Sequence, residues 1–469
     1  MKRVIAFLLI LTVPVGLLLG AHKAVDALQD DVTLQAQTLW GDPALAEGLA
    51  LELLTTCGNH MYWITNCTAG ETETDTEFFF TQDYHGMNEM EYSPGSFNYY
   101  ITSGMGMSTS GGRGFDLGET PLGQLASAVA ANTEPGQTHT ELLNLADFVD
   151  VYPMEYWSHI YTGRFVLEEQ YDSVSGVEEI NQESGGYKTW MELFQFPVEP
   201  GSEMEVTVGK TFDGAVVDLD FRMIDGPEAF FTTVIAEDGM YFSPVFRRFD
   251  GTPIETGRFP QGYGIYYIPM TYADGIDPAL VEEGELCAAK WDFEHLELVY
   301  PLNPGDDVAA MCLSEDGTVL HLIFRQENVY RYCAMDALTG QVLRQTAVLT
   351  ASAEERYCDY AIFEEEELLF LSCGVDYALV DISGNCGVEF TLTKPEGMEM
   401  LPLPESILYR EGRLCMTAKD WYGGSQGFAL AVLSRDGVEY YGIYSTNLHE
   451  TEQGYGSSYV NLEKVEFAH

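Results

Sequence analysis

Short apolar runs separated by polar turns recur through the second half of the chain. In each repeat, an acidic turn precedes a run rich in Tyr, Phe, Val and Leu. The turns end at Gly239, Gly284, Gly317, Glu366 and Gly412, so the repeat is about 45 residues long. Such runs predict β-strands, and glycine supplies the positive φ that closes a tight hairpin.

A second hairpin turn follows in most of the repeats. These turns are Asp250-Gly251, Asp336–Gly340, Asp381–Gly384 and Asp436-Gly437. The repeat at Gly284 lacks the second turn, and we expect Trp291–Tyr300 to supply its strand pair. Four strands in about 45 residues is the period of a propeller blade, which buries both faces against its neighbours. We therefore predict an all-β fold, a β-propeller of about 6–8 four-stranded blades preceded by an N-terminal hydrophobic helix.

The stretch Arg331–Arg344 contains the best-defined turn. Its pattern Ala334-x-Asp336-Ala337-x-Thr339-Gly340-x-x-Leu343 resembles the repeat of quinoprotein-like, PQQ-type β-propellers. The resemblance covers roughly Ala229 to Thr446 and implies a propeller in which this stretch is one outer hairpin. The chain departs from the repeat at Arg344, where the family usually has Trp, and it lacks the adjacent cysteine pair of quinoprotein alcohol dehydrogenases. We therefore expect the fold and predict no cofactor.

The first residues have the pattern of an export signal. Lys2 and Arg3 precede an uncharged apolar run from Val4 to Gly20, which is as long as a short membrane span or a long signal-peptide core. Positive charges before the run favour an orientation with the rest of the chain outside the cytoplasm. We expect residues 1–24 to be either a cleaved signal peptide or a membrane anchor. The protein then lies at the extracytoplasmic face of the cell membrane, or is secreted if the signal is cleaved.

Three further regions follow. Residues 25–47 have mild helical spacing and predict a stalk with short helices. Residues 48–222 predict a β-rich half, either early blades with insertions or a separate β domain, with a helix at Pro121–Ala131 and a strand at Tyr187–Phe196. Residues 223–469 contain the repeats, and the apolar run Tyr459–Phe467 predicts a closing strand that pairs with an early blade.

The charge balance restricts the class of partner. The chain has 22 Lys and Arg against 74 Asp and Glu, which gives a formal net charge of −52. Such a field repels phosphate backbones, so we predict no nucleic-acid binding. The simplest interpretation of the excess acid is a solvated, solubilising surface.

Cysteine usage favours mostly buried thiols over the alternative of a disulfide framework. Cys57 and Cys67 are close enough in sequence to form a disulfide bond. The others mostly lie in apolar strand patterns, where a thiol behaves as a small hydrophobic group: Cys287, Cys312, Cys333, Cys358, Cys373, Cys386 and Cys415. His60 and His85 add metal-capable side chains near Cys57 and Cys67, but the spacing fits no common zinc pattern, and we predict no metal site.

Other motifs favour structural interpretations. Gly423–Gly427 matches the Gly-x-Ser-x-Gly nucleophile pattern, but strands rather than a strand and a helix flank it. The glycine-rich stretch Gly104–Gly114 lacks the Gly-Lys-Ser/Thr of a phosphate loop. Asp218 and Asp220 share one strand face, as either an acid–base pair or a solvated surface. The aromatic run Tyr263–Tyr267 predicts strand packing or a carbohydrate-binding surface.

Together these patterns predict a binding or scaffold module of the cell envelope, with no catalytic residues. The expected ligand is an unknown protein or glycan, because propellers present loops around a central channel. Contact with the membrane is expected through the N-terminal helix if it is uncleaved. Two alternatives stay open: an extracytoplasmic propeller enzyme, which would be a glycan hydrolase or a quinone-dependent dehydrogenase, and a sensor ectodomain.

Overall fold

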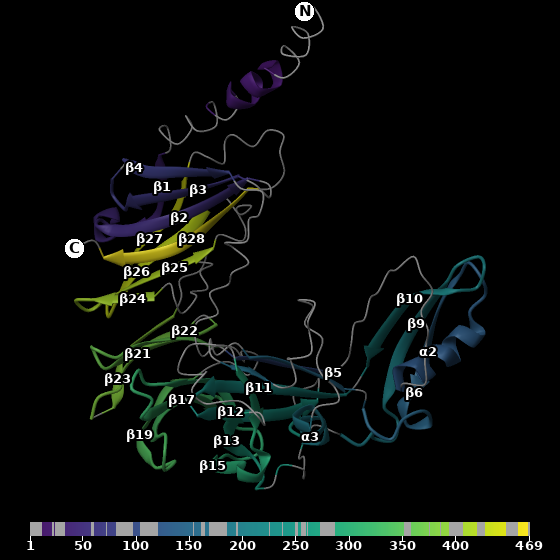
Figure 1. Cartoon of the computed structure of the whole chain (residues 1–469). Helices are drawn as coiled ribbons and strands as arrows, with labels where there is room; N and C mark the ends of the chain where they lie inside the picture. Colours follow the sequence, from purple (N-terminus) through teal and green to yellow (C-terminus); the bar gives the residue numbers. More distant parts are fainter. Residues whose placement is uncertain are drawn as a thin grey trace, which may run out of the picture. The chain divides into compact units, whose positions relative to one another are not determined.

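The structure is a computed structural model in which strands predominate (Figure 1). It describes residues 12–20, 23, 33–57, 61–71, 73–80, 97–103, 121–152, 154–160, 165–167, 185–193, 196–224, 226–236, 238–248, 252–254, 259, 261–272, 287–350, 358–374, 376–384, 386–393, 407–419, 427–446 and 458–467. The strands pair almost throughout in antiparallel sheets, several of them with four strands. The predicted all-β class is confirmed.

The chain divides into two units, each described by itself. The first contains residues 1–90 and 351–469, and the second contains residues 91–350. Residues 12–20 of the first unit are helical. Among the described residues, no helix has the length and apolar character needed to cross a membrane. The signal or anchor at residues 1–24 therefore stays a prediction.

Three sheets form the described part of the first unit. One has the order β28-β2-β3-β4, with β28 (Ser458–Phe467), β2 (Leu49–Cys57), β3 (Met61–Thr68) and β4 (Thr74–Phe80). The second has the order β1-β27-β26-β25-β24, with β1 (Leu34–Gly41), β27 (Gly437–Thr446), β26 (Gly427–Ser434), β25 (Arg413–Lys419) and β24 (Ile407–Arg410). The third has the order β20-β21-β22-β23, with β20 (Cys358–Phe363), β21 (Leu368–Cys373), β22 (Asp376–Asp381) and β23 (Gly387–Thr393). The 3-10 helix η2 (Pro43–Leu45) joins β1 to β2.

The C-terminal strand pairs with the beginning of the chain. β28 runs antiparallel to β2, from Phe467 opposite Leu49 to Ser458 opposite Cys57 (Figure 1). The strand expected at Tyr459–Phe467 therefore exists and joins an early strand. β1 adds itself to the edge of the neighbouring sheet, beside β27. β1 thus extends a sheet built from strands near the C-terminus, and β28 completes a sheet built from strands near the N-terminus.

Alternating apolar residues stack the sheets of the first unit. Leu51 and Leu53 of β2 are buried against Phe428 and Leu430 of β26. On the other face of β26, Ala429 and its neighbours pack on the third sheet. Burying one Leu side chain contributes about 1.5–3 kcal/mol, so these two apolar layers are the main stabilising contacts of the unit.

The second unit contains a regular four-stranded sheet and a larger one. The regular sheet has the order β16-β17-β18-β19, with β16 (Asp307–Leu313), β17 (Val319–Gln326), β18 (Val329–Asp336) and β19 (Val342–Thr350). The larger sheet has the order β11-β12-β13-β14-β8, with β11 (Pro227–Ile235), β12 (Gly239–Arg248), β13 (Gly264–Tyr272), β14 (Cys287–Trp291) and β8 (Phe165–Leu167), and β15 (Glu297–Pro301) also pairs with β13. Buried Leu320, Leu322 and Phe324 of β17 pack against Tyr241 and Ile265 of the larger sheet.

A three-stranded sheet, a pair of strands and four helices, two of them 3-10 helices, complete the described part of this unit. The sheet has the order β10-β9-β6, with β10 (Val216–Met223), β9 (Glu203–Lys210) and β6 (Thr138–Asn144). One of its faces packs on α2 (Pro121–Asn132), which matches the predicted helix. The remaining elements are the pair β5 (Phe97–Ser103) and β7 (Met154–Ile160), the helix α3 (Gly185–Leu193), and the 3-10 helices η3 (Leu145–Asp147) and η5 (Phe293–His295).

The observed hairpins follow most of the predicted turns. Gly239, Gly317 and Gly412 lie at or just before the starts of β12, β17 and β25. Where the repeat has no glycine, Glu367 takes the positive φ instead, at 53°. The expected hairpin at Trp291–Tyr300 is wrong, because β14 and β15 both pair with β13 and not with each other. Two of the predicted repeats therefore form one sheet.

The turn inside Arg331–Arg344 joins β18 to β19 at the edge of its sheet. The Asp336 carboxylate accepts hydrogen bonds from the backbone N–H and the hydroxyl of Thr339, at 2.7 and 2.6 Å. These bonds hold the pKa of Asp336 below its usual value. Gly340 has φ of +66°, and a Cβ there would lie 2.6 Å from the Val299 carbonyl oxygen, so glycine is required twice over.

Two other expectations differ from the structure. Leu34–Gly41, predicted as part of a helical stalk, is the strand β1, because pairing with β27 outweighs a weak helical pattern. The region Tyr187–Phe196, predicted as a strand, lies mostly in α3. Trp190 of this helix is fully buried and meets Phe242 and Trp291 edge to face. A short aromatic run fits either element when periodicity alone is used.

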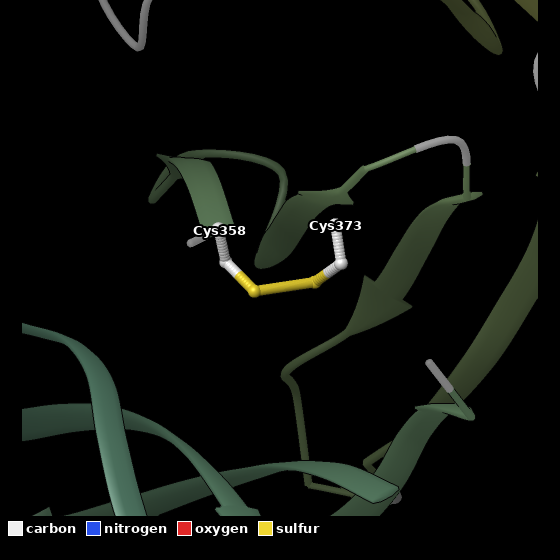
Figure 2. The surroundings of a disulfide bond; sticks show 2 residues. All are labelled: Cys358 and Cys373. Carbon is white, nitrogen blue, oxygen red and sulfur yellow. A yellow bond between two sulfur atoms is a disulfide. The ribbon is translucent and has the colours of Figure 1, made fainter. Parts of the chain in front are cut away.

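The cysteines also differ from the expectation. Cys67 is a free, buried thiol, so the predicted bond to Cys57 is not formed. Cys57 lies opposite Met61 and Cys67 lies opposite Leu51, which puts the two at opposite ends of the β2–β3 hairpin. A disulfide bond instead joins Cys358 to Cys373 (Figure 2). The prediction of buried thiols is correct for Cys333 and Cys415.

The stacked core of the first unit generates a stability prediction. Leu53→Ala removes a fully buried side chain from the cluster shared by β2 and β26. We expect a loss of about 2–5 kcal/mol in the free energy of opening. Leu39→Ala in β1, where the side chain is 49% exposed, is the matched control and should change it by less than about 0.5 kcal/mol. Native-state hydrogen exchange of the β2 and β26 amides measures both, and equal effects would contradict this packing.

Candidate functional site

A depression of about 420 Å³ lies on the β28-β2-β3-β4 sheet of the first unit. Its lining combines carboxylate, amide and hydroxyl side chains with backbone. The lining residues are Ala50, Leu51, Glu52, Asn66, Cys67, Thr68, Glu73, Thr74, Asp75 and Glu466. We call the sheet surface that carries this depression the open face.

Strand alternation produces the open face. Leu51 and Leu53 are buried on the opposite face, so Glu52 between them points toward the depression. On β3, Asn66 is exposed while its neighbours Thr65 and Cys67 are buried. Apolar or small residues occupy the core face of both strands, and polar residues occupy the open face at Glu52 and Asn66. Farther along the open face, Leu54 is buried and lies opposite Ile64.

Strand register brings the polar residues together. Asn66 lies opposite Glu52 on one side and opposite Asp75 on the other. Ala50 lies opposite Glu466 of the C-terminal strand. Directly opposed residues share a face, and strands are about 4.8 Å apart. The backbones of Glu52 and Asp75 are therefore roughly 10 Å apart, with the Asn66 amide between them.

An aromatic pair continues the open face beyond the depression. Tyr62 lies four residues from Asn66 on β3 and therefore points to the same side. It faces Phe79 on β4, and the two rings are stacked with centroids 4.8 Å apart and an interplanar angle of 10°. Both side chains are half-buried. The open face thus has an aromatic end and a polar, concave end.

The chemistry of this face suits a ligand rich in hydrogen-bond donors. Carboxylates accept only, while an amide both donates and accepts. The lining residues include Glu52, Glu73, Asp75 and Glu466 and no Lys, Arg or His. An aromatic pair beside such acceptors matches a molecule with apolar ring faces and several hydroxyl groups.

The predicted pair Asp218 and Asp220 shares a face of β10, as the spacing indicated. Register places Gly209 beside Asp218 and Thr207 beside Asp220. The Thr207 hydroxyl is 2.8 Å from that of Thr140 on β6. This is the face of the β10-β9-β6 sheet opposite to its buried residues, so the two aspartates lie on a polar surface and not in a cleft.

The predicted metal-capable residues are not brought together in the described chain. The Cys67 thiol donates to the Leu51 carbonyl oxygen at 3.7 Å, and burial raises its pKa to about 12. His60 and His85 lie outside the described residues. Within the described ranges, no cluster of three or more His, Cys, Asp or Glu side chains is arranged to hold a metal ion.

Two of the remaining motifs lie wholly or mostly outside the described residues, and the third packs in a core. Gly104–Gly114 and nearly all of Gly423–Gly427 lie outside the described residues, and Gly427 begins β26. The aromatic run at Tyr263–Tyr267 packs within the second unit. Tyr266 is fully buried, and the Tyr267 hydroxyl donates to Asp238 at 2.6 Å.

Sequence comparison gives no relative. No protein-family model matches the chain, and no curated protein matches it. The quinoprotein-like resemblance therefore stays a prediction.

Solved structures show weak similarity. A 6-phosphogluconolactonase candidate from Bacteroides fragilis NCTC 9343 aligns at 8% identity and a TM-score of 0.33, covering 85% of this chain and 95% of that one. TolB from Acinetobacter baumannii aligns at 10% identity and a TM-score of 0.20, covering 55% and 61%. The WD40 domain of SCAP from fission yeast aligns at 10% identity and a TM-score of 0.21, covering 51% and 52%. At these TM-scores none of them carries an argument about this chain.

The open face was missed in the sequence because its residues come from four strands. Glu52, Asn66 and Asp75 each occupy an ordinary solvent-facing position, and Glu466 lies at the other end of the chain. A weak signal exists in Leu49–Leu53, where apolar residues alternate with Ala and Glu. That pattern indicates a strand with one buried face, but it does not show which strands pair with it.

A buried histidine in the second unit is structural. His321 of β17 has its Nδ1 2.7 Å from the Tyr332 hydroxyl, and the two rings are stacked. Burial, and then the positive charge of Arg344, lowers the pKa of His321 from 6.5 to about 4. At neutral pH the imidazole is therefore uncharged, and its role is the buried hydrogen bond with Tyr332.

The low pKa of His321 generates a pH prediction. Between pH 6.5 and about 4 the unfolded chain binds a proton that the folded chain rejects. This contribution to the free energy of unfolding is complete above pH 6.5 and is lost as the pH falls, up to about 3 kcal/mol. His321→Gln should remove this loss, whereas His139→Gln, at an exposed site, should retain it. Urea unfolding at several pH values measures the difference, and parallel profiles for wild type and His321→Gln would refute it.

Proposed function

We propose that this protein is a β-propeller binding module whose ligand is a glycan. The observation that carries the ligand class is the open face, where a polar depression adjoins a stacked aromatic pair. Sugars present apolar ring faces beside hydroxyl groups. Aromatic rings stack on the first, and carboxylate and amide groups hydrogen-bond to the second.

Topology supports the propeller. A four-stranded sheet with an apolar face needs a neighbouring sheet to cover it, and a propeller is built by stacking such sheets face to face. The described sheets β16–β19, β20–β23 and β24–β27 each run in chain order, as consecutive blades do. β28 then returns to the beginning of the chain and completes the sheet of β2–β4. We propose that this sheet is a blade assembled from both ends of the chain.

The envelope location is part of the proposal. It is supported by Lys2 and Arg3 before the apolar run Val4–Gly20, a pattern typical of exported chains. An extracytoplasmic module with a strongly acidic surface would be soluble and would meet glycans there. We propose that the N-terminal segment directs the protein to that side.

Glycan-array screening of the purified chain, followed by calorimetric titration of the best hit, tests the ligand class. We expect Asn66→Ala and Tyr62→Ala each to weaken binding by about tenfold or more, since each removes a hydrogen-bonding or stacking partner. Asn144→Ala is the matched control, because Asn144 is exposed on β6 of the other unit. Its affinity should equal that of the wild type.

Each outcome of this experiment is informative. No array signal above background would refute the glycan ligand. If neither open-face variant changes the affinity, the glycan-binding site is not on the open face. Hydrolysis of the bound glycan in the same assay would favour the enzyme alternative.

A further inference from the structure

The disulfide bond of the first unit joins two strands that are already neighbours (Figure 2). Cys358 lies directly opposite Cys373 in the β20–β21 ladder, with a Cα–Cα distance of 4.6 Å. This short distance is typical of a pair without hydrogen bonds between the two residues. The disulfide bond therefore fastens the ladder at a point where the backbone does not.

The strand held by this bond lies at an edge of its sheet. β20 is an edge strand and pairs only with β21. All its residues from Cys358 to Phe363 are half-buried, whereas every residue of β21 is buried. It is also the first described strand after the boundary between the units at Thr350 and Ala351. Edge strands with little buried surface are the first to open locally.

The two sulfur-bearing residues differ in access. Cys373 is fully buried, and Cys358 is partly exposed. An external thiolate therefore reaches Cys358 and would expel Cys373 into an apolar interior. The comparably buried thiols Cys67 and Cys415 show the cost of that step, because burial raises the pKa of each to about 12. A leaving thiol with a raised pKa departs slowly.

We propose that Cys358–Cys373 is a redox-dependent clasp on β20, opened by dithiol reductants and resistant to monothiols. The clasp holds β20, which is the first described strand in residues 351–469 of the first unit. Opening it frees β20 while β21–β23 stay folded. This inference does not depend on the glycan site.

The chemistry balances as two thiol–disulfide exchanges. A reductant thiolate attacks the Cys358 sulfur, the Cys358–Cys373 bond breaks, and its electron pair passes to the Cys373 sulfur, which takes a proton. With a monothiol, the nearby Cys373 returns to displace the reductant and the bond re-forms. With a dithiol, the second thiol attacks the mixed disulfide first. It leaves as a cyclic disulfide, and Cys358 and Cys373 both become thiols.

The test uses the full chain and two reductants, dithiothreitol and glutathione, at equal thiol concentration. Differential alkylation followed by peptide mapping counts the free thiols at Cys358 and Cys373, and hydrogen exchange follows the β20 amides. We expect dithiothreitol to open the bond and to accelerate β20 exchange by up to roughly 100-fold, the size expected for a short closed loop. Glutathione should leave the bond and the β20 exchange unchanged.

Variants separate the clasp from general effects of reduction. Cys358→Ser should show fast β20 exchange without any reductant. Cys386→Ser, which alters a cysteine outside the disulfide bond, in the turn before β23, should behave as wild type. Equal opening by both reductants, unchanged β20 exchange after reduction, or free thiols at both positions in the untreated protein would each overturn the proposal.

Discussion

The pairing of β28 with β2 is the contact on which the rest of the first unit depends. A four-stranded sheet with an apolar face is not stable alone, because that face must be covered by another sheet. Local hairpins form easily, but they supply only three strands, β2, β3 and β4, to the first sheet of the chain. Here the C-terminal strand supplies the fourth by running antiparallel to β2 along the whole length of that strand. The core shared by β2 and β26 is then buried between two completed sheets.

The open face inherits this dependence. Glu466 enters the depression only because β28 lies beside Ala50. Glu52, Asn66 and Asp75 come from the other three strands of the sheet. The site is therefore assembled by residues from both ends of the chain. A ligand that contacts both sets would bind the closed sheet and stabilise it by mass action.

The predictability of each element follows the range of the contacts that make it. The Asp336–Thr339 turn and the α2 helix are defined by residues close in sequence, and both were predicted. β1 and the β13–β15 pairing depend on distant partners, and both were predicted wrongly. The open face is the extreme case. Its polar residues look like ordinary surface positions until the register of four strands is known, so the sequence carried no clear signal for it.

Closure of the chain by β28 is tested most directly by an engineered disulfide bond. Ala50 and Glu466 lie opposite each other on the open face, so Ala50→Cys with Glu466→Cys should cross-link in the oxidised monomer. Ala50→Cys with Val465→Cys is the control, because Val465 pairs with Leu51 and packs with the buried cluster on the other face. Peptide mapping of the monomer should find the first bond in high yield and the second hardly at all. Equal yields, or a first bond that forms only between two molecules, would contradict closure by β28.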